Sequence, residues 1–422
     1  MSPADASVRQ SRIFYGWWIV AAMTVILFTT GGLAFYNLSV LLKAFVSERN
    51  FPVSMASSAT ALFFVTSGFA GMFAGRFIDR HDVRYFIVGS AILSACCLAS
   101  LDLVRTAWRL YLFYALFGVA YGGCGLVPAM TVLTRWFDAR RATALSIAMT
   151  GLSVGGAVIT PLTAQLVNAV GLAGAGPWLG AAFFLGVAPL TVLVIRPSPE
   201  SMGLNPDGAP ATPGQKAGPA RSGRTWAEAR VTRFFWLVSV AYVFTMAAQV
   251  GGISHLYNMV SSRVDVETAA LAVSVLAASS ITGRLAGGVV LLRAPAIPFT
   301  LVAMAVQGAA LLLISLAADR LLLLAAVALF GLPVGNLLMM QPLLMADAFG
   351  TREYARIYAA HSLVTMVGVA GGPIALGLLH DWLHGYGASY FCAALLGALG
   401  FVMLLLAGRP PAPAGAPPVA GA

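Results

Sequence analysis

The chain has 422 residues, of which 59% are hydrophobic and only 9% are charged. In a typical soluble domain about a quarter of the residues are charged, so this composition predicts an all-α protein that crosses a membrane many times. The formal net charge is +10, but the basic residues are scattered between apolar runs and form no patch of the kind that binds nucleic acid. The four cysteines lie in apolar runs without disulfide or metal-ligand spacing, and we expect no metal or cofactor.

Apolar runs long enough to cross a bilayer, which takes about 20 residues, recur along the whole chain. The first half holds six such runs, at 15–36, 54–78, 85–104, 108–134, 142–167 and 176–195. The second half holds six more, at 234–257, 267–292, 296–317, 321–345, 355–380 and 388–407. The first run lacks a small-residue cleavage site and is followed by further spans, so we expect it to remain as the first helix. The prediction is about twelve transmembrane helices.

A polar stretch divides the chain in two. Residues 197–232 are rich in Pro, Gly, Ser and charge, so they are expected to form a cytoplasmic linker, with a short surface helix at 225–230. Residues 409–422 are rich in Pro and Ala and are expected to form a disordered tail. The predicted domains are therefore an N-terminal six-helix bundle at 1–196 and a C-terminal six-helix bundle at 233–408.

Loop charge predicts the orientation of the helices. If the N-terminus is cytoplasmic, most basic loop residues fall on the cytoplasmic side. The opposite side then holds only Lys43, Arg49, Arg105, Arg109, Arg263 and Arg320. Cytoplasmic loops carry an excess of Lys and Arg, so both termini are predicted to be cytoplasmic.

The two halves repeat at a fixed offset. Phe137 and Arg140 correspond to Phe349 and Arg352, each pair 212 positions apart. At the same offset, the Gly and Pro at 156 and 161 correspond to those at 368 and 373. This repeat predicts two bundles related by an axis along the membrane normal, with a binding site between them near the bilayer midplane. The glycines before each proline fit either a bending interface between the bundles or simple tight helix packing.

A short motif ends the second span. It consists of Gly75, Asp79 and Arg80, followed by Arg84, and it resembles the G-x-x-x-D-R loop motif of the major facilitator superfamily. The resemblance implies that these charges help to close the cytoplasmic side of a transporter. Here the usual glycine after the basic residue is absent. The alternative is that the charges only follow the positive-inside rule.

Arg284 is the most informative single residue. It lies within the apolar run 267–292, where a central arginine costs about 2.5–3.5 kcal/mol on insertion scales. Gly283, Gly287 and Gly288 surround it with small side chains that allow close approach of a neighbouring helix or a water-filled cavity. We predict that Arg284 anchors an anion inside a transporter. The alternative is that its side chain reaches back to the cytoplasmic edge and only fixes the helix position.

A second resemblance depends on three features. They are the sequence Tyr-Gly-Trp-Trp at 15–18, Arg135 with Arg140 after the fourth span, and Arg284 in the eighth. Together they resemble the monocarboxylate transporter and oxalate:formate antiporter branch. The resemblance implies that Arg284 binds the substrate carboxylate. We also predict that Arg135 and Arg140 belong to the cytoplasmic gate. The sequence departs from the branch at Ser280, where mammalian members carry an acidic residue, and at 36–37, where they carry a lysine.

Further candidates for the substrate site are polar groups in apolar runs. His255 resembles a histidine of bacterial members of the branch and could take up a proton, because histidine titrates near physiological pH; it could instead lie bonded at the outer interface. Tyr121 is flanked by glycines and could donate to a carboxylate, or could be an ordinary core tyrosine. Asn336, Tyr36 and Asn37 are weaker candidates, because such groups often make helix-to-helix hydrogen bonds.

The predicted function is proton-coupled symport of a small organic monocarboxylate, such as lactate or pyruvate, with His255, Arg284 and His361 as proton-coupling candidates. The first alternative is exchange of a dicarboxylate, in which His361 supplies a second positive charge; the next is export of other small molecules. No spacing typical of a nucleophile and base or a phosphate loop is present, so an enzyme is not expected. The predicted partners are the substrate, a proton and lipid, for a functional monomer in a bacterial inner membrane.

Overall fold

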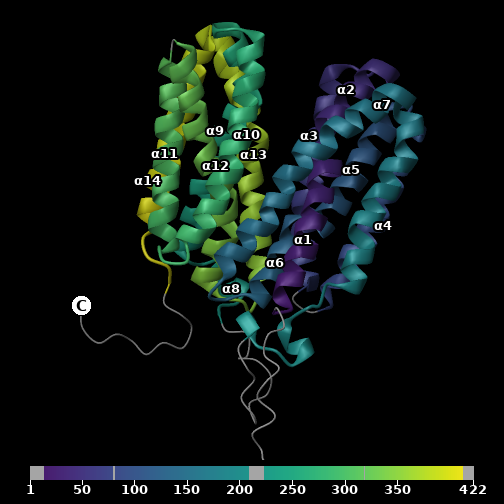
Figure 1. Ribbon diagram of the computed structural model, residues 1–422, viewed down its shortest axis with the longest axis vertical. Helices are drawn as coiled ribbons and strands as arrows, with labels where there is room; N and C mark the ends of the chain where they lie inside the picture. The colour runs from purple at the N-terminus through teal and green to yellow at the C-terminus, as the bar shows by residue number, and fades with distance from the viewer. Residues whose placement is uncertain (1–13, 79–80, 209–222, 318, 412–422) are drawn as a thin grey trace, which may run out of the picture.

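The computed structural model describes residues 14–78, 81–208, 223–317 and 319–411. Helices form two bundles that diverge at the top of Figure 1 and approach each other at the lower end. The helices of the first bundle are α1 (Gly16–Thr30), α2 (Leu38–Arg49), α3 (Val53–Ile78), α4 (Val83–Ala99), α5 (Ala107–Cys124), α6 (Leu126–Trp136) and α7 (Arg141–Leu193). Those of the second are α9 (Arg233–Arg263), α10 (Val266–Val290), α11 (Ala296–Leu316), α12 (Arg320–Phe349), α13 (Tyr354–Leu383) and α14 (Tyr386–Ala407).

The membrane-spanning helices agree with the predicted number. Ten helical stretches of the described chain are long and apolar enough to cross a bilayer. The shorter apolar helix α4 has 17 residues. Helix α7 runs for 53 residues through Gly171, whose positive φ of 69° breaks the helix, so α7 contains two spans. Counting both spans of α7 and adding α4 gives the twelve expected crossings.

Several predicted boundaries differ from the structure. The first span was expected to end at residue 36, but α1 continues through a π-helical turn, η2 (Gly31–Phe35), into α2, and the helical stretch ends at Arg49. The fifth and sixth spans were expected to be separate, and the break at Gly171 lies between them, although α7 continues on both sides of it without an intervening loop. Hydropathy marks where a chain is apolar, whereas a helix continues wherever its backbone hydrogen bonds continue.

Glycine pairs fasten helices within each bundle. A Cβ on Gly155 of α7 would lie 2.0 Å from the Phe28 carbonyl oxygen of α1, and one on Gly368 of α13 would lie 2.0 Å from the Val243 carbonyl oxygen of α9. The backbones of these helix pairs therefore touch, which only glycine permits. Similar packing thus occurs inside both bundles, although the two glycines are one residue out of the 212-residue register: Gly156, which corresponds to Gly368, packs on the Tyr36 ring instead.

The polar connection between the bundles binds a loop of each one. The Asp207 carboxylate accepts hydrogen bonds from the backbone nitrogens of 138–140, after α6. On the other side, the Arg224 nitrogen donates to the Phe349 carbonyl, and the Trp226 nitrogen donates to Glu353. The expected short helix is present as α8 (Trp226–Ala229). The connection therefore holds the two loops that the 212-residue repeat makes equivalent.

Candidate functional site

Arg284 of α10 is buried where the two bundles meet, and its side chain is only 2% exposed. Its Nε donates to the Gly335 carbonyl of α12 in the same bundle, at 3.2 Å. Its Nη1 crosses to α7 of the other bundle and donates to the Met149 carbonyl at 2.5 Å and to Ser153 Oγ at 3.0 Å. The side chain therefore points into the protein and away from lipid.

The remaining terminal nitrogen of Arg284 has no assigned partner. Nη2 makes no hydrogen bond to any described residue, and it is not among the fully buried polar atoms. Within the described ranges no carboxylate forms an ion pair with this guanidinium. A buried charge is stable only when it is paired or well hydrogen-bonded. Arg284 thus combines a full positive charge with two N–H donors that remain for an anion.

The helix that carries Arg284 is held against α7 over one further turn. Ser146 Oγ donates to the Arg284 carbonyl at 2.7 Å, and Thr143 Oγ1 donates to the Gly288 carbonyl at 3.2 Å. A Cβ on Gly288 would lie 2.7 Å from Ser146 Cβ, so the glycine permits this close approach. The bundles are therefore in direct contact below the guanidinium.

A second contact between the bundles involves α3 and α13. A Cβ on Gly75 would lie 2.5 Å from the Ala355 carbonyl oxygen, and one on Gly68 would lie 2.7 Å from Leu363 Cδ1. Two turns from the Arg284 contacts, Arg141 Nη1 of α7 pairs with Asp347 of α12 at 3.2 Å. Because Gly75 of the predicted gate motif has no side chain, α3 can approach α13 closely at this point.

The other residues predicted for the cytoplasmic gate lie near the same end of the bundles as Gly75. Asp79 and Arg80 lie outside the described residues. Arg84 pairs with Asp82 at 2.6 Å, and although burial alone would raise the pKa of Asp82, the hydrogen bonds from Arg84 hold that pKa below its ordinary value. Arg135 Nη2 donates to the Ile78 carbonyl at 3.0 Å, joining α6 to the end of α3. The backbone nitrogen of Arg140 contacts Asp207 of the linker, at 3.3 Å.

Two predicted tyrosines lie near Arg284. Tyr36 is 39% exposed, its hydroxyl shares a hydrogen bond with Ser153, and it lies within electrostatic range of Arg284. Tyr121 of α5 is close enough to Tyr36 and to Tyr358 of α13 for the hydroxyls to interact electrostatically. The structure therefore brings Tyr36 and Tyr121 to the guanidinium region and adds Tyr358 from the opposite bundle.

The two predicted histidines are in different places. His361 of α13 is fully buried; its Nδ1 is 3.0 Å from Ser239 Oγ, and its Nε2 has no partner among the described residues. Its ring packs 6.5 Å from that of Tyr358. His255 instead contacts the Pro373 carbonyl at 3.0 Å. At 1.5 Å per residue, counted from the adjacent ends of α9 and α10, His255 and Arg284 differ in depth by about 15 Å. The structure does not bring His255 to Arg284.

The weaker polar candidates mostly make contacts within a bundle. Asn336 Nδ2 donates to the Gly283 and Leu332 carbonyls at 2.8 and 2.9 Å, which joins α12 to α10. Asn37 is buried, and its Nδ2 donates to the Leu33 carbonyl one turn earlier, at 3.3 Å. Ser280 is buried one turn before Arg284. These contacts correspond to the helix-to-helix alternative for Asn336.

The groups that bind Arg284 from α7 and α12 were not predicted. Met149 and Gly335 use backbone carbonyls, which every residue has, so the sequence carries no signal for them. Ser153 could have been noticed as a hydroxyl in the glycine-rich run at 151–156.

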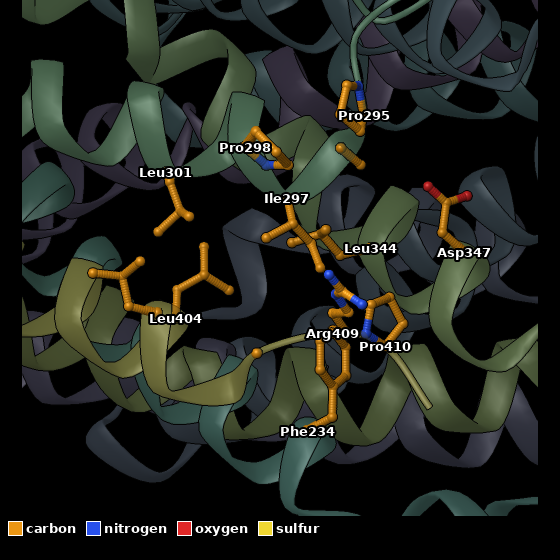
Figure 2. Close-up of a pocket in the computed structure, with 13 residues that line it drawn as sticks. Phe234, Pro295, Ile297, Pro298, Leu301, Leu344, Asp347, Leu404, Arg409 and Pro410 are labelled. Atoms are coloured by element: carbon orange, nitrogen blue, oxygen red, sulfur yellow. The ribbon is translucent and has the colours of Figure 1, made fainter. Parts of the chain in front are cut away.

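A cavity of about 450 Å³ lies away from Arg284, among α9, α11, α12 and α14 (Figure 2). Apart from Asp347 and Arg409 its lining is apolar, and it shares no residue with the Arg284 contacts.

Two helical bundles with a buried charged group between them are the architecture of two-bundle membrane proteins. The family model of the Major Facilitator Superfamily matches residues 23–364, and the chain belongs to this superfamily. The superfamily predicted from the Gly75 motif is thereby confirmed.

The curated relatives match only parts of the chain. An uncharacterised MFS-type transporter of Bacillus subtilis is 29% identical over 163 residues, which are 37% of this chain and 38% of that protein. The glycerol-3-phosphate transporter of Bacillus subtilis is 25% identical over 38% of this chain and 37% of its own length. The membrane sensor protein UhpC of Salmonella typhimurium is 25% identical over 54% of this chain and 53% of its own. The chain therefore spans about a third to a half of the length of these relatives.

Solved structures match nearly the whole chain. The Escherichia coli fucose:proton symporter superposes with a TM-score of 0.71 at 14% identity, covering 92% of this chain and 98% of that one. The human organic anion transporter TETRAN gives a TM-score of 0.67 at 16% identity, covering 92% and 99%. At these identities the likeness establishes the fold.

Proposed function

We propose that the protein is a secondary active transporter of a small organic monocarboxylate, working by alternating access between residues 1–196 and residues 233–408. The observation that carries the proposal is the Arg284 guanidinium, which is buried between the bundles. Within the described residues it has no carboxylate partner, and its Nη2 makes no hydrogen bond. A guanidinium suits a carboxylate because its planar fork can donate two parallel hydrogen bonds. One fixed charge favours a monoanion over a dianion.

The contacts of Arg284 suggest how binding is linked to movement. The residue belongs to one bundle, but its Nη1 donates to Met149 and Ser153 of the other. A carboxylate that takes up the guanidinium competes with these acceptors, so occupied and empty forms have different contacts between the bundles. A ligand shifts a conformational equilibrium only through such a difference in interaction.

The proposed orientation has both termini on the cytoplasmic side of a bacterial inner membrane. In this proposed orientation the contact between the bundles lies on the cytoplasmic side, at the end that carries the linker, which makes this an outward-facing form. We further propose that the protein functions as a monomer. For proton coupling we favour His361 over His255, because His361 packs against Tyr358 at the interface and its Nε2 is unpartnered among the described residues. Histidine is the side chain whose unperturbed pKa lies nearest physiological pH.

The experiment is uptake of radiolabelled lactate and benzoate into proteoliposomes with an imposed inward proton gradient. Arg284→Gln should abolish uptake of both acids, and Arg284→Lys should restore only part of it, because an ammonium lacks the planar fork. The matched control is Arg263→Gln, since Arg263 also donates to backbone carbonyls but does so at the far end of α9. Unchanged uptake in Arg284→Gln would refute the site. If uptake does not depend on the proton gradient but increases when the liposomes are preloaded with an anion, the protein is an exchanger and not a proton symporter.

A second candidate substrate is an organophosphate. It is favoured by the relatives named as a glycerol-3-phosphate transporter and, in Chlamydia muridarum, as a probable hexose phosphate transport protein, each 25–26% identical over 38% of this chain. A phosphate also suits a guanidinium. Counterflow of glycerol 3-phosphate that exceeds counterflow of any carboxylate would establish this alternative, and loss of that counterflow in Arg284→Gln would assign the phosphoryl group to Arg284.

A further inference from the structure

The π-helical turn η2 sets the direction of two aromatic side chains. The Tyr36 nitrogen donates to the Gly31 carbonyl five residues back, at 2.9 Å. One residue more than an α-helical turn rotates the following side chains by about 100°. Gly31 and Gly32 allow this turn to lie directly on α7, since added Cβ atoms would be 2.8 Å from the Leu152 carbonyl oxygen and 2.7 Å from that of Gly155. π turns inside α-helices occur frequently at functional sites.

Phe35, Tyr36, Phe64 and Tyr121 form a cluster that we call the aromatic ledge. The Phe35 ring centroid lies 5.1 Å from that of Tyr36, 5.9 Å from that of Phe64 and 6.4 Å from that of Tyr121. Phe35 and Phe64 are half-buried and Tyr36 is exposed, so ring surface remains uncovered. The Tyr121 hydroxyl has no hydrogen-bond partner in the described part of the chain, and it is not among the fully buried atoms.

The ledge faces the opposite bundle and adjoins the guanidinium. Phe64 lies one turn before Gly68, on the same side of α3, and that side meets α13 at Leu363. The Tyr36 ring packs on Gly156 of α7, and its hydroxyl reaches Ser153, which accepts from Arg284. The Ser153 hydroxyl is therefore the only group between the Tyr36 hydroxyl of the ledge and the Arg284 guanidinium in this chain of hydrogen bonds.

We propose that the aromatic ledge binds the ring of the transported anion, which makes the substrate an aryl or arylalkyl monocarboxylate. This rests on the proposed function, in which Arg284 binds the carboxylate. Aromatic rings prefer edge-to-face or offset contacts with centroids about 4.5–7 Å apart, and the ledge offers uncovered rings of that kind. Lactate and pyruvate have nothing to place there. The contacts among the four rings leave the ledge pre-formed, as expected of a ligand site.

The test is binding of radiolabelled benzoate to the purified full-length protein, with competition by phenylacetate, cyclohexanecarboxylate, lactate and benzyl alcohol. Benzoate and phenylacetate should compete at least tenfold better than lactate and several-fold better than the saturated ring, and benzyl alcohol should not compete. Phe64→Leu should weaken benzoate five- to tenfold and leave lactate unchanged. The matched control is Phe69→Leu, because Phe69 lies on the same helix with its ring 61% exposed.

The outcomes separate the ring subsite from the carboxylate site. If Arg284→Gln abolishes binding of both benzoate and lactate but Phe64→Leu affects the two acids equally, the ledge proposal is overturned and the carboxylate site remains. If Arg284→Gln leaves benzoate binding intact, the proposed function itself is wrong. The size-exclusion profile of each variant shows whether it is folded. If Phe64→Leu does not fold, Phe35→Leu serves as the second variant of the aromatic ledge.

Discussion

Gly75→Ala should open the contact between the bundles. The new Cβ would lie 2.5 Å from the Ala355 carbonyl oxygen, whereas an ordinary contact begins at 3.4 Å, so α3 and α13 must separate by about 0.9 Å locally. Overpacking of this kind costs about 1–3 kcal/mol. The gain in helix propensity from Gly to Ala is the same in every conformation in which α3 is helical, so it cancels. The closed contact should become about 5- to 150-fold less favoured.

Opening can be measured as the rate at which a maleimide labels a thiol placed at the other contact between the bundles. Ser146→Cys is nearly isosteric, and Ser146 is only 1% exposed against α10. With the four native cysteines replaced by serine, Gly75→Ala should raise the labelling rate at this position by the factor given above. The control is Gly89→Ala, where an added Cβ meets no atom within 4 Å. Equal rates in the two alanine variants would show that the α3–α13 contact does not hold the bundles together.

Two further predictions concern charged pairs. Arg141→Gln and Asp347→Asn should each raise labelling of the Ser146→Cys thiol about two- to fivefold, because an ion pair in which one partner is still partly exposed contributes about 0.5–1 kcal/mol. The double variant should show little further rise, and additive effects would show that the two residues act separately. Asp82→Asn keeps the N-cap of α4 but removes the negative charge. Because Arg84 holds the pKa of Asp82 below its ordinary value, the Asp82 carboxylate stabilises the folded protein above about pH 4. This stabilisation is lost as the pH falls through the pKa of Asp82 in the folded protein. Thermal melts of wild type and variant should therefore differ at pH 7 and converge on acidification; a constant difference contradicts the ion pair.

The sequence alone predicted the helical class, the number of crossings and the superfamily, because apolar runs and the Gly75 motif are local signals. It also singled out Arg284, since a charge within an apolar run is rare. It did not predict that the helical stretch that begins with α1 continues through η2 into α2, because a π turn is defined by backbone hydrogen bonds. His255 and His361 were indistinguishable in the sequence, as each lies in an apolar run, and only the packing of α9 against α13 separates them.

The acceptors of the Arg284 guanidinium could not have been found in the same way. Two of them are backbone carbonyls, and the third is a serine 131 positions away along the chain. Which face of α7 meets α10 depends on side chains from both bundles at once. Composition and spacing contain no information about that rotation.

The backbone-to-backbone packing at Gly155 and Gly368 limits where the protein can deform. Helices that touch through their main chains cannot slide without lifting apart, so α1 with α7 and α9 with α13 each behave as one solid piece. The bundle-to-bundle faces are mixed: Gly75 closely approaches the Ala355 carbonyl, and hydroxyls and charged side chains make the other contacts. A movement of one bundle against the other therefore takes place between these pieces and not within them.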